Sequence, residues 1–102
     1  MTINQFFDSQ DEIRIKIFKA LADPIRLQII RILNDKKEEL SCGEMGQLLN
    51  MSKSAASYHF KTLREAGLTS TRKAGQNKFV QLNKESFQSF LPGFLESLTT
   101  ER

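Results

Sequence analysis

The stretch "MSKSAASYHFKTLREAGL", residues 51–68, decides the fold predicted for this chain. Ser52 is a good residue for capping the start of a helix, and Gly67 is a good residue for ending one, so the spacing predicts a helix between them. The apolar residues that recur at helical spacing form its inward stripe: Ala56, Phe60 and Leu63. The serines and basic residues between them then lie mainly on the outward side.

A shorter helix is predicted just before this one. Ser41 and Glu44 have the spacing of a capping box, which marks a helix start, and the helical pattern runs to Leu49. The dipeptide Asn50-Met51 supplies the turn. Two short helices joined by a tight turn form a helix-turn-helix, which we place at residues 41–66.

The sequence pattern changes after residue 68 to that of a β-hairpin. Two short segments flank residues 74–77, whose glycine suits a tight connection. Val80 and Leu82 fall on one face of the second segment. A hairpin over residues 69–82 that follows a helix-turn-helix is the wing of a winged helix.

Apolar spacing predicts three more helices. One covers residues 9–21. The next begins at Pro24 after a capping Asp23, and it is apolar over so wide an arc that it sits centrally in the core. The last begins near Lys84, and Pro92-Gly93 should kink or divide it.

Length and composition fit one compact domain over residues 1–102, with 39% hydrophobic residues. The predicted fold class is mainly α with a small β-hairpin wing, a winged helix-turn-helix of about five helices. The first residues lack the pattern of a signal peptide, and no apolar run approaches the ~20 residues of a membrane span. We therefore expect a cytoplasmic protein without a membrane partner.

Positive charge is concentrated in residues 52–78. This segment has six basic residues and one acidic residue, a net charge of +5, whereas the whole chain has a net charge of +3. A basic segment within a chain that is otherwise slightly acidic indicates a surface that binds a polyanion. Lysines that only solubilise a helix and a hairpin would give the same count.

Two stretches at matching spacing carry a family resemblance: "FKALADPIRLQIIRIL", residues 18–33, and the stretch at residues 51–68. Over roughly residues 16–82 the chain resembles the ArsR/SmtB family of bacterial transcriptional repressors. The resemblance implies a homodimeric winged-helix protein that binds a palindromic operator in double-stranded DNA. It also implies release from the operator when an inducer fills a sensor site.

Short polar side chains at the start of a recognition helix allow close approach to phosphates and base edges. Mapped onto this chain, the resemblance gives as DNA-reading residues Lys53, Ser54, Ser57, Tyr58, His59 and Lys61. It gives as wing residues Arg72, Lys73 and Lys78. His59 has a second reading, in which it packs beside Ala55 at the helix edge. The wing tip has Gln76 and Asn77 where the family often has a basic residue, which favours phosphate contact over minor-groove reading.

The familiar metal sites of this family lack their ligands here. In thiolate-metal members two cysteines flank one residue, but Ser41 and Gly43 occupy those places and Cys42 lies between them. The chain has one cysteine and one histidine in total, so we expect no metal and no cofactor. Cys42 itself has two readings, a reactive thiolate that would make a redox-responsive repressor and an inert, partly buried small residue.

Five of the eight phenylalanines lie in the first seven or last sixteen residues. A monomer this small has difficulty burying two terminal apolar stripes, so we predict that the N-terminal and C-terminal helices form a dimer interface. The predicted interface residues are Phe6, Phe7, Ile13, Phe87, Phe90, Leu91, Phe94 and Leu98. The alternative is that both helices fold back on their own core. An inducer, if one binds, is expected in the apolar space between the terminal helices.

Two rival functions can be weighed from the sequence. The single histidine, single cysteine and four aspartates provide no nucleophile–base pair at recognisable spacing, and no glycine-rich phosphate loop is present, so we expect no enzyme. A winged helix that binds a protein is the other rival, although protein interfaces are depleted in lysine. The sequence therefore predicts a DNA-binding transcriptional regulator, a repressor of ArsR type without the familiar Cys/His metal sites.

Overall fold

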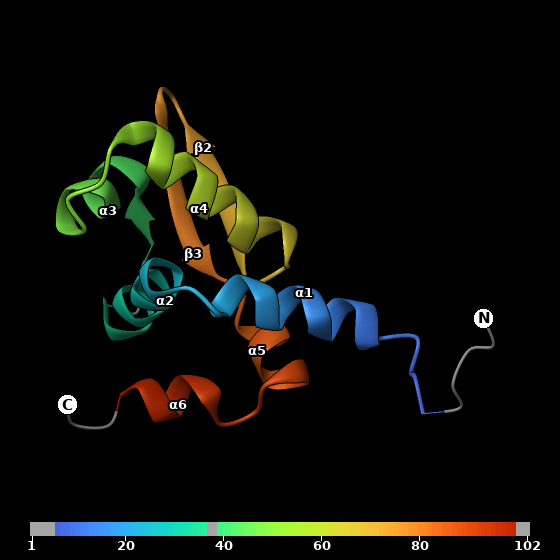
Figure 1. Ribbon diagram of the computed structural model, residues 1–102. Coiled ribbons are helices and arrows are strands. Elements are labelled where there is room, and N and C mark those ends of the chain that lie inside the picture. The colour runs from blue at the N-terminus through green and yellow to red at the C-terminus, as the bar shows by residue number, and fades with distance from the viewer. Residues whose placement is uncertain (1–5, 37–38, 100–102) are drawn as a thin grey trace.

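The computed structural model describes residues 6–36 and 39–99, which form six helices and a three-stranded sheet (Figure 1). In chain order the elements are α1 (Asp11–Leu21), α2 (Pro24–Lys36), β1 (Leu40–Ser41), α3 (Cys42–Leu48), α4 (Lys53–Glu65), β2 (Thr69–Ala74), β3 (Asn77–Leu82), α5 (Lys84–Phe90) and α6 (Phe94–Leu98). The predicted order, a helix-turn-helix followed by a hairpin, is confirmed.

The core is built around α2, which packs against α1, α4, α6 and β3. Ile29, Ile30 and Leu33 are each at most 2% exposed, which confirms the central position predicted for this helix. Full burial of such a side chain stabilises the fold by about 1.5–3 kcal/mol.

The predicted helix caps are present. Asp23 Oδ1 accepts hydrogen bonds from the first backbone N–H groups of α2 at 2.9 and 3.1 Å. Ser41 and Glu44 form the reciprocal capping box at the start of α3, with both bonds 3.0 Å long. Between α3 and α4, Asn50 adopts a left-handed conformation with φ of 52°, which asparagine tolerates better than most residues.

The sheet contains a strand that the sequence did not predict. The strand order is β1-β3-β2, and Leu40 of β1 pairs with Val80 of β3. A strand of two residues is too short to show an alternating pattern, so only its tertiary pairing defines it. The connection between β2 and β3 has two residues, whereas four were predicted. In this connection Gly75 has a positive φ of 62°, which glycine adopts without steric cost.

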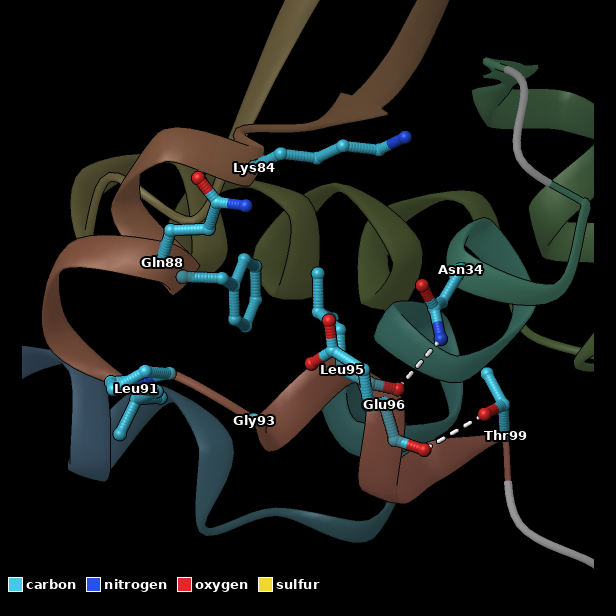
Figure 2. A pocket seen from close by; sticks show the side chains of 10 residues that line it. Asn34, Lys84, Gln88, Leu91, Gly93, Leu95, Glu96 and Thr99 are labelled. Atoms are coloured by element: carbon cyan, nitrogen blue, oxygen red, sulfur yellow. Dashed lines mark hydrogen bonds between the residues drawn. The ribbon is translucent and has the colours of Figure 1, made fainter.

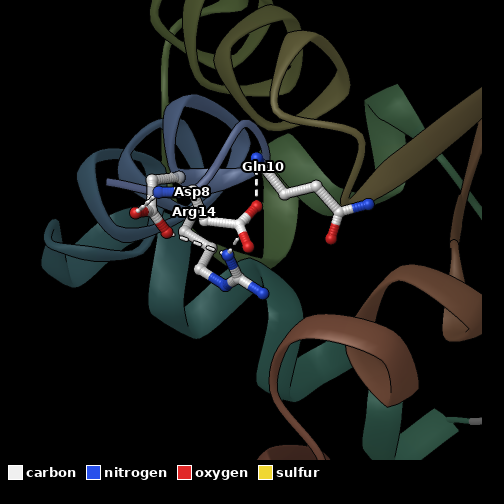
Figure 3. A network of polar contacts seen from close by, with 4 residues as sticks. Asp8, Gln10 and Arg14 are labelled. Carbon is white, nitrogen blue, oxygen red and sulfur yellow. Dashed lines mark hydrogen bonds and ion pairs between the residues drawn. The ribbon is translucent and has the colours of Figure 1, made fainter. Parts of the chain in front are cut away.

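The two ends of the described chain differ slightly from the predicted helices. α1 begins at Asp11 because Asp8 and Gln10 form a turn, in which Asp8 Oδ1 accepts from the Gln10 N–H at 2.7 Å (Figure 3). Arg14 closes this turn by donating to Asp11 Oδ1 at 2.8 Å. At the other end, Pro92-Gly93 divides the last helix into α5 and α6, as one of the two predicted outcomes. This division raises the number of helices from about five to six.

Candidate nucleic-acid interface

α4 has a buried face and an exposed face, as its apolar spacing predicts. The inward stripe is at most 5% exposed and consists of Ala56, Phe60 and Leu63. The outward face carries the exposed side chains that were predicted to read DNA: Lys53, Ser54, Ser57, Tyr58 and Lys61. These side chains point outward, as predicted. Their contact with DNA stays a prediction.

The first turn of α4 is electrostatically open to an anion. Ser52 Oγ accepts a hydrogen bond from the Ala55 N–H at 3.2 Å, which satisfies one of the free N–H groups at this end. No acidic residue lies in the first turn, so no carboxylate offsets the positive end of the helix dipole. A phosphate group would be stabilised at this position.

The wing places two lysines directly opposite each other. Lys73 on β2 pairs with Lys78 on β3 in the hairpin register, and both side chains are exposed. Like charges opposite each other in a sheet are destabilising. This pair weakens the isolated hairpin and concentrates positive charge where an anionic partner would relieve the repulsion.

Arg72, the third predicted wing residue, is held by the chain itself. Its guanidinium donates to both carboxylate oxygens of Glu39, the Nε–Oε2 bond being 3.3 Å long, and lies 4.9 Å from the centroid of the Phe79 ring. The hydrogen bond from Arg72 lowers the pKa of the Glu39 carboxyl. The charge of Arg72 is therefore offset within the fold, in contrast to the charges of Lys73 and Lys78.

We expect Glu39→Gln to strengthen DNA binding by the wing. The change removes the carboxylate that neutralises Arg72, so the guanidinium becomes available to a phosphate. Each added phosphate contact should steepen the slope of log affinity against log salt by about 0.9. Fluorescence anisotropy on duplex DNA at several salt concentrations measures this slope. Glu85→Gln, at an exposed position on α5, is the matched control, and equal slopes for both variants would show that Arg72 stays out of reach of DNA.

A groove of about 630 Å³ joins the recognition helix to the wing. Lys53 and Ser57 of α4 line it on one side and Lys78 lines it on the other, while Met51 and Phe60 contribute apolar surface. The structure thus brings predicted residues from two separate motifs to one surface.

Cys42 lies in the wall of this groove and is half-buried. Burial raises the pKa of its thiol, and the nearby charges of Lys78 and Arg64 act in the opposite direction without cancelling that shift. A raised pKa means a smaller thiolate fraction at neutral pH than a free cysteine has. Of the two readings of Cys42, the inert one is the one that this environment favours.

We expect the Cys42 thiol to be alkylated by iodoacetamide more slowly at pH 7 than the thiol of glutathione. Because the pKa of the folded thiol lies above its ordinary value, the rate should rise as pH is raised through that higher value. Intact-mass spectrometry over time measures the rate. A denatured sample supplies the control for accessibility, and faster reaction than glutathione at pH 7 would revive the redox reading.

His59 was predicted either to contact DNA or to pack beside Ala55. The structure shows it half-buried, with Nδ1 at 3.1 Å from Nη1 of Arg26, a residue of α2 that is 8% exposed. This pair of residues was not predicted from the sequence. The available signal was a single arginine within an otherwise apolar helix stripe, which does not reveal its partner.

The terminal apolar residues divide into three groups. Phe6, Phe7 and Ile13 are exposed, Phe6 by as much as 82%. Phe90, Leu91 and Phe94 are half-buried against the core. Phe87 and Leu98 are at most 6% exposed and serve the chain's own core.

α1 also exposes two apolar residues that were not predicted at an interface. Ile15 is 44% exposed and Phe18 is 56% exposed. They lie three positions apart on the side of the helix that faces away from Ile17 and Ala20, which are buried. α1 is therefore apolar on two faces.

A second hollow, of about 600 Å³, lies between α2, α5 and α6 (Figure 2). Phe87, Leu91 and Leu95 contribute apolar surface to it, and Asn34 Nδ2 donates to the Leu95 carbonyl at 3.0 Å. The space predicted for an inducer lies between the N-terminal and C-terminal helices, whereas none of the residues that line this hollow belongs to α1. In the described part of the chain, no three His, Cys, Asp or Glu side chains are placed to hold a metal ion, and no helix is both long and apolar enough to cross a membrane.

Comparison with known proteins identifies the family. Residues 21–72 match the family model described as a helix-turn-helix domain. The chain is 58% identical over 98 residues to the HTH-type transcriptional regulator YceK of Bacillus subtilis, covering 96% of this chain and 95% of that one. It is 34% identical over 89 residues to an arsenical resistance operon repressor of Staphylococcus xylosus, covering 82% and 78%. Its structure is similar to that of HlyU from Vibrio cholerae, with a TM-score of 0.75 and 35% identity over 90% of this chain and 94% of that one. The chain therefore belongs to the ArsR/SmtB family of winged helix-turn-helix transcriptional regulators.

Proposed function

We propose that the protein is a homodimer that binds a palindromic operator in the cytoplasm and represses transcription there. The observation that carries this proposal is the groove between α4 and the wing, whose lining includes Lys53 and Lys78 and, among the described residues, no carboxylate side chain. A surface of this shape and charge suits the phosphate backbone at the edge of a major groove.

The arrangement of the apolar surfaces supports a dimer. α1, α5 and α6 lie away from the tip of the wing (Figure 1), and α1 exposes Ile15 and Phe18. Pairing two protomers through this side leaves both α4 helices free to enter successive major grooves, one DNA turn apart.

Repression is the proposed direction of regulation. The relative from Staphylococcus xylosus is named a repressor. HlyU of Vibrio cholerae is named a transcriptional activator; its sequence alignment with this chain is 39% identical over 77 residues and covers 76% of this chain and 69% of that one. A reporter gene placed behind the selected operator distinguishes the two, because a repressor lowers its expression.

The test of the proposal is selection of bound fragments from the source genome, followed by a salt titration on the best fragment. We expect an inverted repeat bound by two protomers. With ~6–10 phosphate contacts, affinity should fall by roughly 10³–10⁵ between about 50 and 200 mM salt. Lys53→Ala combined with Lys61→Ala should make the salt slope shallower by about 0.9 for each phosphate contact removed.

Lys36→Ala combined with Lys84→Ala is the matched control, because both lysines are exposed but lie outside residues 52–78. Absence of any enriched sequence, together with binding that barely responds to salt, would point to the rival function of a protein-interaction module.

A further inference from the structure

Arg26 connects three helices through one buried guanidinium. It is 8% exposed, its Nε donates to the Ala20 carbonyl at 2.6 Å, and its Nη2 lies 3.5 Å from the Lys19 carbonyl. These carbonyls belong to the last turn of α1, where they lack helical partners and where the helix dipole favours a cation. The remaining nitrogen, Nη1, reaches across to His59 of α4.

The contact with His59 determines where the imidazole proton lies. Arg26 Nη1 and His59 Nδ1 are 3.1 Å apart. A guanidinium has only donors and no acceptor, so Nη1 must donate and Nδ1 must accept. A ring whose Nδ1 accepts a hydrogen bond is neutral and carries its single proton on Nε2.

The other ring nitrogen is open to a partner outside the chain. Within the described residues, Nε2 of His59 has no hydrogen-bond partner, and it is not among the buried unpaired polar atoms. The ring packs edge-on against Tyr58, with centroids 5.3 Å apart, and the side chain of Tyr58 is itself 61% exposed on the outward face. His59 therefore presents an N–H donor beside residues that are predicted to contact DNA.

We propose that Arg26 is a positioning residue for DNA recognition, which fixes His59 as the neutral Nε2–H tautomer so that the recognition helix offers DNA a hydrogen-bond donor at this position. The proposal rests on the proposed function, because the partner of this donor is an acceptor on DNA: a phosphate oxygen or, in the major groove, the N7 of a purine, the O6 of guanine or the O4 of thymine. An amino group of cytosine or adenine, which is a donor, is not recognised here.

The tautomer is measurable without DNA and without a variant. The chain has one histidine, so a long-range ¹H–¹⁵N spectrum of protein labelled with ¹⁵N-histidine shows a single ring. At pH 7.5 we expect an unprotonated Nδ1 and a protonated Nε2. A Nδ1–H ring, a charged ring or the tautomer mixture of a histidine peptide under the same conditions would overturn the proposal.

Arg26→Lys tests the part played by the guanidinium. A lysine keeps a cation near the end of α1 but lacks the planar fork that reaches α1 and His59 together. We expect the tautomer ratio to move to that of the peptide, with unchanged circular dichroism. A structural role confined to α1 would leave the tautomer as it is in the wild type.

Two substitutions of His59 test the outward donor. His59→Gln places an amide N–H near the position of Nε2. The shorter His59→Asn can turn its Oδ1 toward Arg26, but its NH₂ group does not reach the position of Nε2. We expect His59→Asn to lose about tenfold in operator affinity per half-site, the weight of one hydrogen bond, and His59→Gln to lose no more than about threefold. Equal affinities for the wild type and His59→Asn would overturn the donor contact.

Modified operators identify the acceptor: methylphosphonate replaces single phosphates, 7-deazaguanine or 7-deazaadenine removes the N7 of a purine, 2-aminopurine removes the O6 of guanine, and 5-methyl-2-pyrimidinone removes the O4 of thymine. The penalty of His59→Asn should disappear on the one modification that removes its acceptor, and persistence on all of them would overturn the contact. Failure of the wild type to bind any operator would instead count against the proposed function, and the tautomer measurement would still test the link between Arg26 and His59.

Discussion

Replacing Phe87 with alanine will lower the free energy of unfolding by about 3–5 kcal/mol. Phe87 is 1% exposed, and its ring stacks on that of Phe94 with centroids 6.0 Å apart and planes 5° apart. Alanine removes the ring and leaves a cavity that the neighbouring helices fill only in part, which adds to the lost burial. Urea unfolding followed by circular dichroism measures the change.

Phe18→Ala is the matched control, because it makes the same substitution at a ring that is 56% exposed. Its effect should depend on protein concentration, since the exposed side of α1 is the surface proposed for pairing between protomers. The effect of Phe87→Ala should persist at every concentration. A loss of less than about 0.5 kcal/mol, the range of ordinary surface substitutions, would show that Phe87 is not part of the core.

Helix starts were predictable because their signals are local. Asp23, Ser41 and Ser52 each cap a helix through a backbone N–H two or three residues away, so the sequence contains both partners within one turn. The inward stripe of α4 was predictable for a similar reason, since residues three and four positions apart share a helix face. Together these signals are enough to order the helix-turn-helix and the wing.

Contacts between distant segments were not predictable from one sequence. Arg72 meets Glu39, and Arg26 meets His59, in both cases across 33 residues. Each pair depends on how helices and strands pack, and neither partner carries a local signal that names the other. The same holds for β1, which is a strand only because β3 lies beside it.

The residues of the dimer interface stay a prediction, and the structure adds two exposed apolar candidates to them, Ile15 and Phe18. The apolar spacing in α1 predicts one stripe, from Ile13 to Leu21. A single stripe of this kind is expected to pack on the core of its own chain. The structure shows Ile17 and Ala20 buried there. Ile15 and Phe18 form a second stripe on the outward side, which a search for a single face does not separate from the first.

Exchanging Ile15 and Phe18 for glutamate will separate the protomers and weaken operator binding at least ~100-fold, because the two half-sites are then no longer bound as one unit. Both side chains are more than 40% exposed in the single chain, so the fold tolerates charge there. Across a pairing surface, the same charges would be buried without partners and opposite their own copies. Sedimentation velocity measures the oligomeric state, and anisotropy measures binding to the full operator and to a half-site.

Gln28→Glu combined with Leu48→Glu is the matched control, because it adds the same two negative charges at exposed positions on α2 and α3, outside α1, α5 and α6. This control should remain dimeric and lose far less affinity. Half-site binding should be similar for both double variants, since α4 and the wing are unchanged in each. If the α1 variant sediments as a dimer and binds the full operator as the control does, the outward face of α1 is not the pairing surface. The other predicted interface residues, at the N-terminal end and on α5 and α6, are then the remaining candidates.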